Sequence, residues 1–286
     1  MARKKAPKIV VVTDSTASLA PADAVREGIE VVPLKVIIGA KSYTEGIDVD
    51  ADMIASALSE FLPVSTSRPT PEEFVAVYKD LAAKGASEII SVHLSAKMSG
   101  TADSARLAAR QSPVPVTVVD TQQVGVSVGF AAGSAARAQA GGACAKDIVE
   151  AAENTSRAAT VLLYVDTLEY LRRGGRVGAA AALIGSALAV KPILTIKDGL
   201  VVPLEKVRTE AKALARLEAL AAEAVEAIDG EYQIGIQHLA NEAVAQQVAA
   251  RLATSLGRDS VPVDEVGAAI GAHVGPGMIA VTVAPH

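Results

Sequence analysis

The chain of 286 residues is long enough for two domains, each with its own core. Half of the residues are hydrophobic but only 3% are aromatic, so the core must consist of Ala, Val, Leu and Ile, which suits helices packed on sheets. The net charge of −5 argues against a nucleic-acid-binding surface, which needs clustered Lys and Arg, and a single cysteine, Cys144, excludes an internal disulfide and a Cys-rich metal site.

The start of the chain and its apolar runs bear on the cellular location. Residues 1–7 are basic, but a strand pattern follows them instead of the apolar core of a signal peptide. Every long apolar run is interrupted before it reaches the roughly 18 residues that a membrane-spanning helix needs. We therefore expect a cytoplasmic protein without a transmembrane segment, whose contact with membranes would at most be transient.

The first half alternates strands, polar turns and helices. Three short β-branched runs, at 8–14, 87–94 and 115–120, are typical of strands buried on both faces, and each ends in polar residues before a helical pattern. Such units predict a doubly wound α/β domain with a parallel sheet, where ligands collect at the carboxyl ends of the strands. We also expect a strand over 30–38, bulged or at an edge because of Pro33, and a loop over 43–48.

A cluster of hydroxyls at Ser65-Thr66-Ser67 precedes a strong helix start. Proline suits the first helical position, and Thr70 with Glu73 has the spacing of a capping box, so a helix should begin at Pro71. A second hydroxyl turn, Ser99-Gly100-Thr101, precedes a helix over 102–110. Hydroxyls beside free helical N–H groups can cradle a carboxylate or phosphate, although residues 65–67 could also simply solvate a loop.

The second half changes character. Asp198-Gly199 between two apolar runs predicts a β-hairpin over 190–206. Further strand signals fall at 160–165, 231–238, 260–266 and 277–283, and helical ones at 144–158, 210–227 and 241–256. The stretch 179–188 is too small and apolar for a surface helix, and Cys144 should be buried. The change predicts an N-terminal α/β domain over 1–156 and a C-terminal α+β domain with a mixed or antiparallel sheet over 157–286.

The sequence does not match the standard catalytic and metal-binding patterns in the structural context that each requires. Residues 125–129 have the letters of a Gly-x-Ser-x-Gly elbow, but Ser127 falls in a helical pattern and not on a strand-to-helix turn. The four histidines are too scattered for a metal site, so we expect no metal. His93 lies inside an apolar strand and is as well explained by a hydrogen-bonded core position as by a function, and His238 at a strand end is equally open.

Two further features of the sequence indicate a site that binds an anion. His273 stands among Gly and Pro residues, in an expected loop that leaves it room to reach a ligand. Arg172, Arg173 and Arg176 surround two glycines; they could form a solvated helix end, or Arg176 could present its guanidinium to a carboxylate or phosphate. With no nucleophile and base in register, this set binds an anion more obviously than it catalyses a reaction.

Motifs across nearly the whole chain carry a family resemblance. In order they are Thr13-Asp14-Ser15-Thr16, Thr66-Ser67-x-Pro69-x-Pro71-x-Glu73-Phe74, His93-Leu94-Ser95 with Ser99-Gly100-Thr101, Val119-Asp120-Thr121, Leu168-Glu169-Tyr170-Leu171-x-Arg173-Gly174-Gly175-Arg176, Lys191-Pro192-Ile193-Leu194 with Asp198-Gly199, Lys206-Val207-Arg208-Thr209, and His273-Val274-Gly275-Pro276-Gly277. The chain thereby resembles the DegV family of bacterial fatty-acid-binding proteins, whose best-understood members carry fatty acids to a kinase.

The resemblance implies a lipid tunnel associated with the interface of the two domains. It implies that Thr66 and Ser99 hold the fatty-acid carboxylate with His273 close by, and we include the neighbouring Ser67 in the predicted site. Arg176 and Arg208 match arginines associated with kinase engagement or acyl-phosphate handling. The chain departs from the family at Arg68, where Gln is common, which puts a cation beside the carboxylate site or at its rim.

The leading hypothesis is a carrier that catalyses no reaction itself and needs no cofactor. It would shield a fatty acid such as palmitate or oleate and present the carboxylate to a fatty-acid kinase that uses ATP. One alternative is an enzyme acting on a phosphorylated or carboxylated small molecule, with His273 as acid/base and Arg176 as clamp. Another is a lipid-responsive regulator that has no kinase partner.

Overall fold

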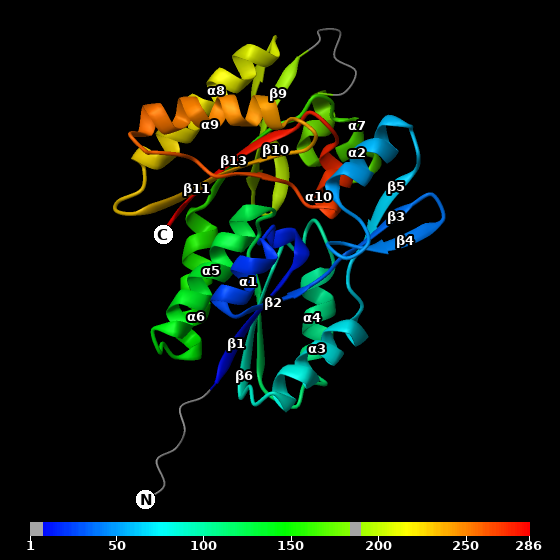
Figure 1. Ribbon diagram of the computed structural model, residues 1–286, viewed down its shortest axis with the longest axis vertical. Coiled ribbons are helices and arrows are strands. Elements are labelled where there is room, and N and C mark those ends of the chain that lie inside the picture. Colours follow the sequence, from blue (N-terminus) through cyan, green and yellow to red (C-terminus); the bar gives the residue numbers. More distant parts are fainter. Residues whose placement is uncertain (1–7, 184–189) are drawn as a thin grey trace, which may run out of the picture.

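The computed structural model describes residues 8–183 and 190–286 and contains two large sheets, one in each half of the chain (Figure 1). The first sheet has four parallel strands in the order β2-β1-β6-β7, which confirms the predicted parallel sheet. Its strands are β1 (Ile9–Asp14), β2 (Ile29–Val32), β6 (Glu88–His93) and β7 (Val116–Asp120).

Helices cover both faces of this sheet. Alternate side chains of β1 explain the two layers, since Ile9 and Val11 pack beneath α5 and α6, whereas Val12 packs against α3 and α4. Both faces are therefore buried, as the continuous β-branched runs predict. The helices of this half are α1 (Pro21–Glu27), α3 (Pro71–Ala83), α4 (Thr101–Ala109), α5 (Val126–Ala140) and α6 (Ala145–Ala158), with a short 3₁₀ turn η1 (Ser15–Ala17) after β1.

The segment between β2 and α3 differs from the sequence prediction. The expected single strand over 30–38 is divided at Pro33, because proline cannot donate a ladder hydrogen bond, and its two parts join different sheets. The second part is β3 (Lys35–Ile38), the centre of a three-stranded antiparallel sheet in the order β4-β3-β5. The other members of this segment are β4 (Lys41–Thr44), α2 (Ala51–Ser59) and β5 (Val64–Ser67).

Strands also occupy part of an expected loop and a segment that one interpretation read as a loop. The start of the expected loop over 43–48 belongs to β4, and the hydroxyl cluster at 65–67 belongs to β5. The small sheet packs against the second half of the chain, because Val36 and Ile54 share one apolar core with Leu163 and Leu194. Thr66 thus lies beside the C-terminal half although it precedes the first-half helices α3 and α4 in sequence.

The second large sheet has six strands in the order β10-β9-β8-β13-β11-β12. All its pairings are antiparallel except that of β11 with β12, which agrees with the predicted mixed sheet. The predicted hairpin is confirmed, and both Asp198 and Gly199 have the positive φ of a tight turn between twisted strands. The strands are β8 (Thr160–Tyr164), β9 (Lys191–Lys197), β10 (Leu200–Val207), β11 (Tyr232–His238), β12 (Val263–Glu265) and β13 (Ile279–Pro285).

Two long helices cover one face of this sheet. Leu162, Ile236 and Val281 pack beneath α8 (Glu210–Glu226) and α9 (Glu242–Leu256), which lie along the outer face in Figure 1. The opposite face points toward the first half of the chain. Near it lie the short elements α7 (Glu169–Arg173), η2 (Gly178–Leu183) and α10 (Ala268–Val274).

Two burial predictions are wrong. Cys144 is exposed, because α6 begins only at Ala145 and leaves the cysteine in the turn after α5. In the stretch 179–188, η2 presents three alanines to solvent, while residues 184–188 lie outside the described residues. The domain boundary near Ser156 stays a prediction; α6 ends at Ala158 and β8 begins at Thr160.

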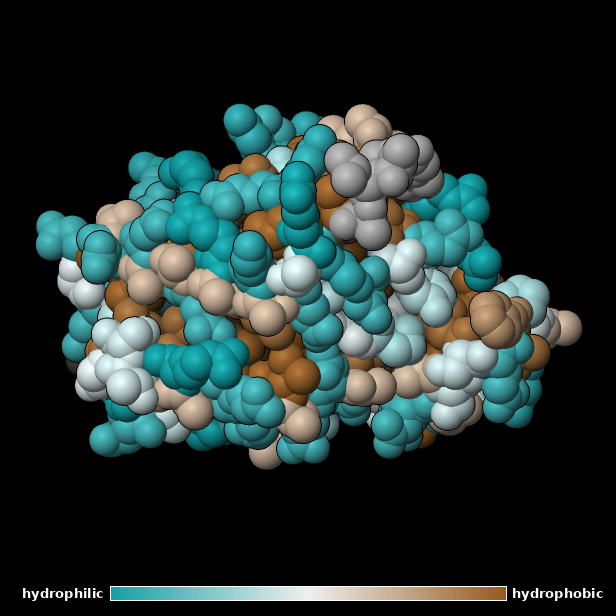
Figure 2. Space-filling view, turned by 90° about the horizontal axis from the view of Figure 1, so that it is seen from above, coloured by the Kyte–Doolittle hydropathy of each residue, from teal (hydrophilic) through white to brown (hydrophobic). Residues whose placement is uncertain are grey.

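The face of the molecule on the side of the second half is mainly hydrophilic (Figure 2). Figure 2, which views the molecule from the side of the second half, shows hydrophilic side chains over most of that face and hydrophobic ones between them. Within residues 8–183 and 190–286, none of the helices combines the length and apolar character needed to cross a bilayer.

Candidate functional site

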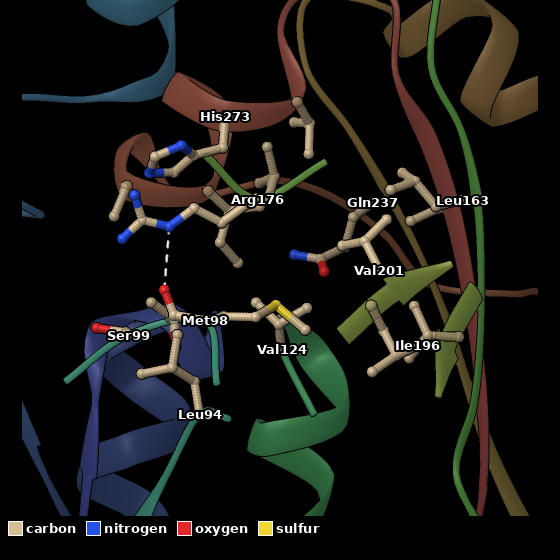
Figure 3. Close-up of a pocket in the computed structure, with 18 of the residues that line it drawn as sticks. Leu94, Met98, Ser99, Val124, Leu163, Arg176, Ile196, Val201, Gln237 and His273 are labelled. Carbon is tan, nitrogen blue, oxygen red and sulfur yellow. Dashed lines mark hydrogen bonds between the residues drawn. The ribbon is translucent and has the colours of Figure 1, made fainter. Parts of the chain in front are cut away.

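A pocket lies between the open face of the six-stranded sheet and the first half of the chain. The empty space of the pocket, including the open solvent at its mouth, is about 920 Å³. Apolar side chains dominate its walls, and the polar ones include Thr66, Ser99, Arg176 and His273. Figure 3 shows the last three of these at one side of the pocket, with Leu163, Ile196 and Val201 at the other.

The apolar floor follows from strand alternation. Val161 and Leu163 of β8 face the pocket, while Leu162 between them packs beneath α8 and α9. The same alternation on the paired strands brings further side chains to this face. They are Ile196 of β9, Val201 of β10, Gln237 of β11, and Ala280 and Thr282 of β13.

Thr66 and His273 meet at the polar end of the pocket. The distance between Thr66 Oγ1 and His273 Nε2 is 2.8 Å, and 207 positions separate the two residues in sequence. His273 is in the last turn of α10 and not in a loop as expected; Gly275, with a φ of 76°, ends that helix. Five of its seven helical residues are buried, and this packing overrides the glycine-rich sequence that suggested a loop.

The glycine pair after α7 makes room for the histidine ring. A Cβ on Gly174 would lie 2.7 Å from His273 Cε1 and closer still to Nδ1, so only glycine fits beside the ring. Burial, with a smaller contribution from the Arg176 charge, lowers the pKa of His273 from 6.5 to about 4. The imidazole is therefore neutral at pH 7. Its Nδ1 is buried and has no hydrogen-bond partner among the described residues.

Ser99 and Arg68 lie at the start of α4. Ser99 Oγ is 2.8 Å from Thr101 Oγ1, and Gly100 is the N-cap residue of the helix. The Arg68 guanidinium packs so closely on Gly100 that a Cβ there would overlap it. Arg68 is exposed and lines the pocket, so this cation lies at the mouth. A cation beside the positive end of a helix dipole favours a bound anion between them.

The three arginines around Gly174-Gly175 divide into two groups. Arg172 and Arg173 form ion pairs with Glu169 at 2.7 and 2.8 Å. The hydrogen bonds from Arg172, and to a smaller extent from Arg173, lower the pKa of Glu169 to about 2. They form the solvated helix end that was one of the two interpretations. Arg176 instead lines the pocket, where its Nε donates to the Met98 carbonyl at 3.0 Å and Nη1 donates to the Gly174 carbonyl.

Two predicted site residues do not join this group. Ser67 is exposed on the face of β5 opposite to Thr66, and its hydroxyl donates to the Arg68 carbonyl at 3.3 Å. Side chains alternate along a strand, so Thr66 and Ser67 cannot both face the pocket. Arg208 is exposed just beyond the end of β10 and is not among the residues that line the pocket.

Other candidate residues have structural roles. His93 is fully buried, with Nδ1 2.8 Å from Asp14 Oδ2 and Nε2 2.7 Å from Ser91 Oγ, so it is a hydrogen-bonded core residue. Ser127 lies inside α5, which confirms that residues 125–129 are no catalytic elbow. In the parts of the chain that the structure describes, no three His, Cys, Asp or Glu side chains gather as a metal-binding group.

Gln237 is a pocket residue that the sequence analysis missed. Only 4% of it is exposed, and its Oε1 accepts a hydrogen bond from the Val126 N–H at 3.1 Å. The one available signal was a glutamine near the end of a predicted strand, directly after Ile236.

Comparisons with known proteins agree with this architecture. Residues 8–286 match the family described as "Uncharacterised protein, DegV family". A DegV domain-containing protein of Streptomyces coelicolor is 48% identical over 96% of this chain and 98% of its own length.

Two solved structures are similar over nearly the whole fold. A DegV family protein from Thermus thermophilus, described as binding fatty acid, has a TM-score of 0.89 and 32% identity, covering 98% of this chain and 100% of that one. DegV of Bacillus subtilis, described as a fatty acid binding protein, has a TM-score of 0.87 and 31% identity with the same coverage. The motifs, the two-domain α/β fold and these similarities together show that the chain belongs to the DegV family.

Proposed function

We propose that this protein binds a long-chain fatty acid, such as palmitate or oleate, in the pocket between its two halves. The carboxylate lies at the end formed by Thr66, Ser99 and His273, and the acyl chain extends over the apolar face of the second sheet. One observation carries this proposal: anion-binding groups gather at one end of a pocket whose other walls are mainly apolar. The fatty-acid binding described for the Thermus thermophilus and Bacillus subtilis proteins supports it.

The chemistry of the two ends suits such a ligand. Burial of the acyl chain stabilises the complex by about 0.8 kcal/mol for each CH₂ removed from water. Hydroxyls of Thr66 and Ser99 can donate to the carboxylate, and hydrogen bonds to a charged group contribute about 1.5–3 kcal/mol each. The neutral His273 imidazole can donate from one nitrogen, and Arg68 and Arg176 add positive charge. Among the described residues that line the pocket, none is an Asp or Glu that would compete with the ligand carboxylate.

We further propose that the protein is a cytoplasmic carrier that presents the carboxylate to a partner kinase, which uses ATP to form the acyl phosphate. The exposed Arg68 at the mouth supports this step, because it puts the carboxylate end near solvent, where a second protein can reach it. Arg208, on the surface beyond β10, is a candidate contact for that kinase. No cofactor is required, and the fatty acid is the ligand.

Mass spectrometry of lipid extracted from the purified native protein tests the ligand. We expect a long-chain fatty acid in near-equal molar amount; a consistent absence, together with no binding of added palmitate or oleate, would overturn the proposal. A pull-down followed by an acyl-phosphate assay tests the kinase step. Fatty-acid binding with no kinase recovered would favour a lipid-responsive regulator, and turnover without a partner that is lost in His273→Ala would favour an enzyme.

A further inference from the structure

The amide of Gln237 is a polar group in the apolar part of the pocket. Gln237 is on β11, on the same sheet face as Ala280 and Leu163, its successive neighbours across β13 and β8. Only 4% of the Gln237 surface is exposed, so the residue is more than nine-tenths buried. Its Nε2 is fully buried and finds no hydrogen-bond partner within residues 8–183 and 190–286.

The orientation of this amide is fixed by the start of α5. Val126 is the first residue of that helix, so its N–H has no partner inside the helix and needs an acceptor from elsewhere. The amide oxygen of Gln237 accepts this bond. If the oxygen and nitrogen of the amide were exchanged, the NH₂ group would face the Val126 N–H, and two donors cannot form a hydrogen bond with each other. Gly125 leaves the space for it, because a Cβ there would lie 2.9 Å from Gln237 Oε1.

The nitrogen is thereby directed into the pocket. In Figure 3 the Gln237 side chain reaches from β11 toward the interior and lies between His273 on one side and Leu163 on the other. Gln237 is therefore part-way along the pocket, away from the end where Thr66 and His273 meet. A second polar group on the same sheet face, the hydroxyl of Thr282, also lines the pocket.

An unbranched hydrocarbon chain would leave the Nε2 donor unpaired. A buried donor without an acceptor is unfavourable, and a hydrogen bond from N–H to a double bond compensates only weakly. An oxygen atom on the chain can accept a hydrogen bond from one of the two N–H groups of Nε2. A hydroxyl group on the chain would accept a hydrogen bond from Nε2 and could donate one through its own O–H to Gln237 Oε1 or to the Thr282 hydroxyl, whereas an oxo group would only accept the bond from Nε2.

We propose that Gln237 is a specificity residue that selects acyl chains carrying a hydroxyl or oxo oxygen part-way along their length. This inference rests on the proposed fatty-acid binding and adds the substrate class to it. Sites built to hydrogen-bond a ligand group discriminate strongly against the analogue that lacks it. The preference for the best-placed oxygenated chain over the plain chain should be about fivefold to a hundredfold.

The test is a set of displacement titrations on the full chain after removal of bound lipid. The probes are stearate and a series of hydroxystearates and oxostearates that differ only in the position of the oxygen. The measured quantity is the ratio of the Kd of stearate to that of each oxygenated chain. Because both Kd values come from the same protein, a general effect of a substitution on folding cancels from this ratio.

Wild-type protein should show the preference at one or two neighbouring oxygen positions. Gln237→Leu and Gln237→Met should abolish it, mainly by improving the binding of stearate, while the control Ile196→Val, which changes the same pocket without removing a donor, should retain it. Equal binding of stearate and every oxygenated chain by the wild type, or a preference that survives in both Gln237 variants, would overturn the inference and leave fatty-acid binding intact. Failure of all these chains to bind would overturn the proposed function and the inference together.

Discussion

Adding one methyl group at Gly174 should damage the ligand site without straining the backbone. Gly174 has a φ of −73° and a ψ of −10°, which alanine adopts readily. The new Cβ would lie 2.7 Å from His273 Cε1 and 3.2 Å from Cγ, so the ring must move and its 2.8 Å contact with Thr66 should break. Overpacking of this kind lowers the free energy of unfolding by about 1–3 kcal/mol.

The larger effect should appear in fatty-acid affinity. Loss of one hydrogen bond to the carboxylate weakens binding by about 1.5–3 kcal/mol, or about tenfold to a hundredfold in Kd. Titration with palmitate and thermal unfolding of the ligand-free protein measure the two effects separately. The neighbouring Gly175 supplies a matched control, because it has a φ of 71° and open space around its missing Cβ.

The two alanine variants should therefore separate strain from site geometry. Gly175→Ala should lower the free energy of unfolding by about 1–2 kcal/mol, the strain of a left-handed alanine, and leave the Kd for palmitate unchanged. Gly174→Ala with wild-type affinity, or equal losses of affinity in both variants, would refute the assignment of His273 to the carboxylate site.

Three further predictions concern pH, helix capping and the mouth of the pocket. The pKa of His273 is about 4 in the folded protein and about 6.5 in the unfolded chain, so between these pH values the unfolded chain binds a proton at His273 that the folded protein does not. The free energy of unfolding of the ligand-free protein should therefore fall by up to about 3 kcal/mol as the pH drops from 6.5 to 4. Urea unfolding should show a shallower fall in His273→Gln, and identical pH profiles would contradict the burial of a neutral ring. Thr70→Ala removes the hydroxyl that accepts a hydrogen bond from the Glu73 N–H in the capping box, while the backbone N–H of residue 70 can still donate to the Glu73 carboxylate; stability should fall by about 1 kcal/mol, measured by thermal unfolding, with no change in ligand affinity, and a loss of affinity would mean that Thr70 is part of the site. Arg68→Gln should weaken palmitate binding a few-fold and reduce its dependence on salt, and an unchanged salt dependence in titrations would show that this cation does not contact the anion.

The elements that sequence could predict are those whose local chemistry determines their structure. The buried parallel strands follow from continuous β-branched runs, and the helix at Pro71 follows from its proline and capping box. The hairpin at Asp198-Gly199 follows because both residues tolerate a positive φ. In each case the neighbouring residues along the chain are sufficient, and the structure confirms the prediction.

The elements that were missed depend on partners far away in sequence. Ser65-Thr66-Ser67 has no hydrophobic alternation, so only its pairing with β3 identifies it as a strand and puts Ser67 on the outer face. The helix that carries His273 is hidden by its glycines and is stabilised by burial between other elements. The residue types of the site were predictable, but its geometry comes from β5, α10 and the turns beside α4 and α7.

The central claim is the position and direction of the fatty acid, and a crystal structure of the palmitate complex tests it most directly. We predict that the carboxylate lies within hydrogen-bond distance of the Thr66 and Ser99 hydroxyls and of the His273 ring, with the acyl chain running past Gln237 over the floor formed by β8, β9 and β13. Density for palmitate in the reverse direction, with its carboxylate at Gln237, or outside this pocket altogether, would contradict the account.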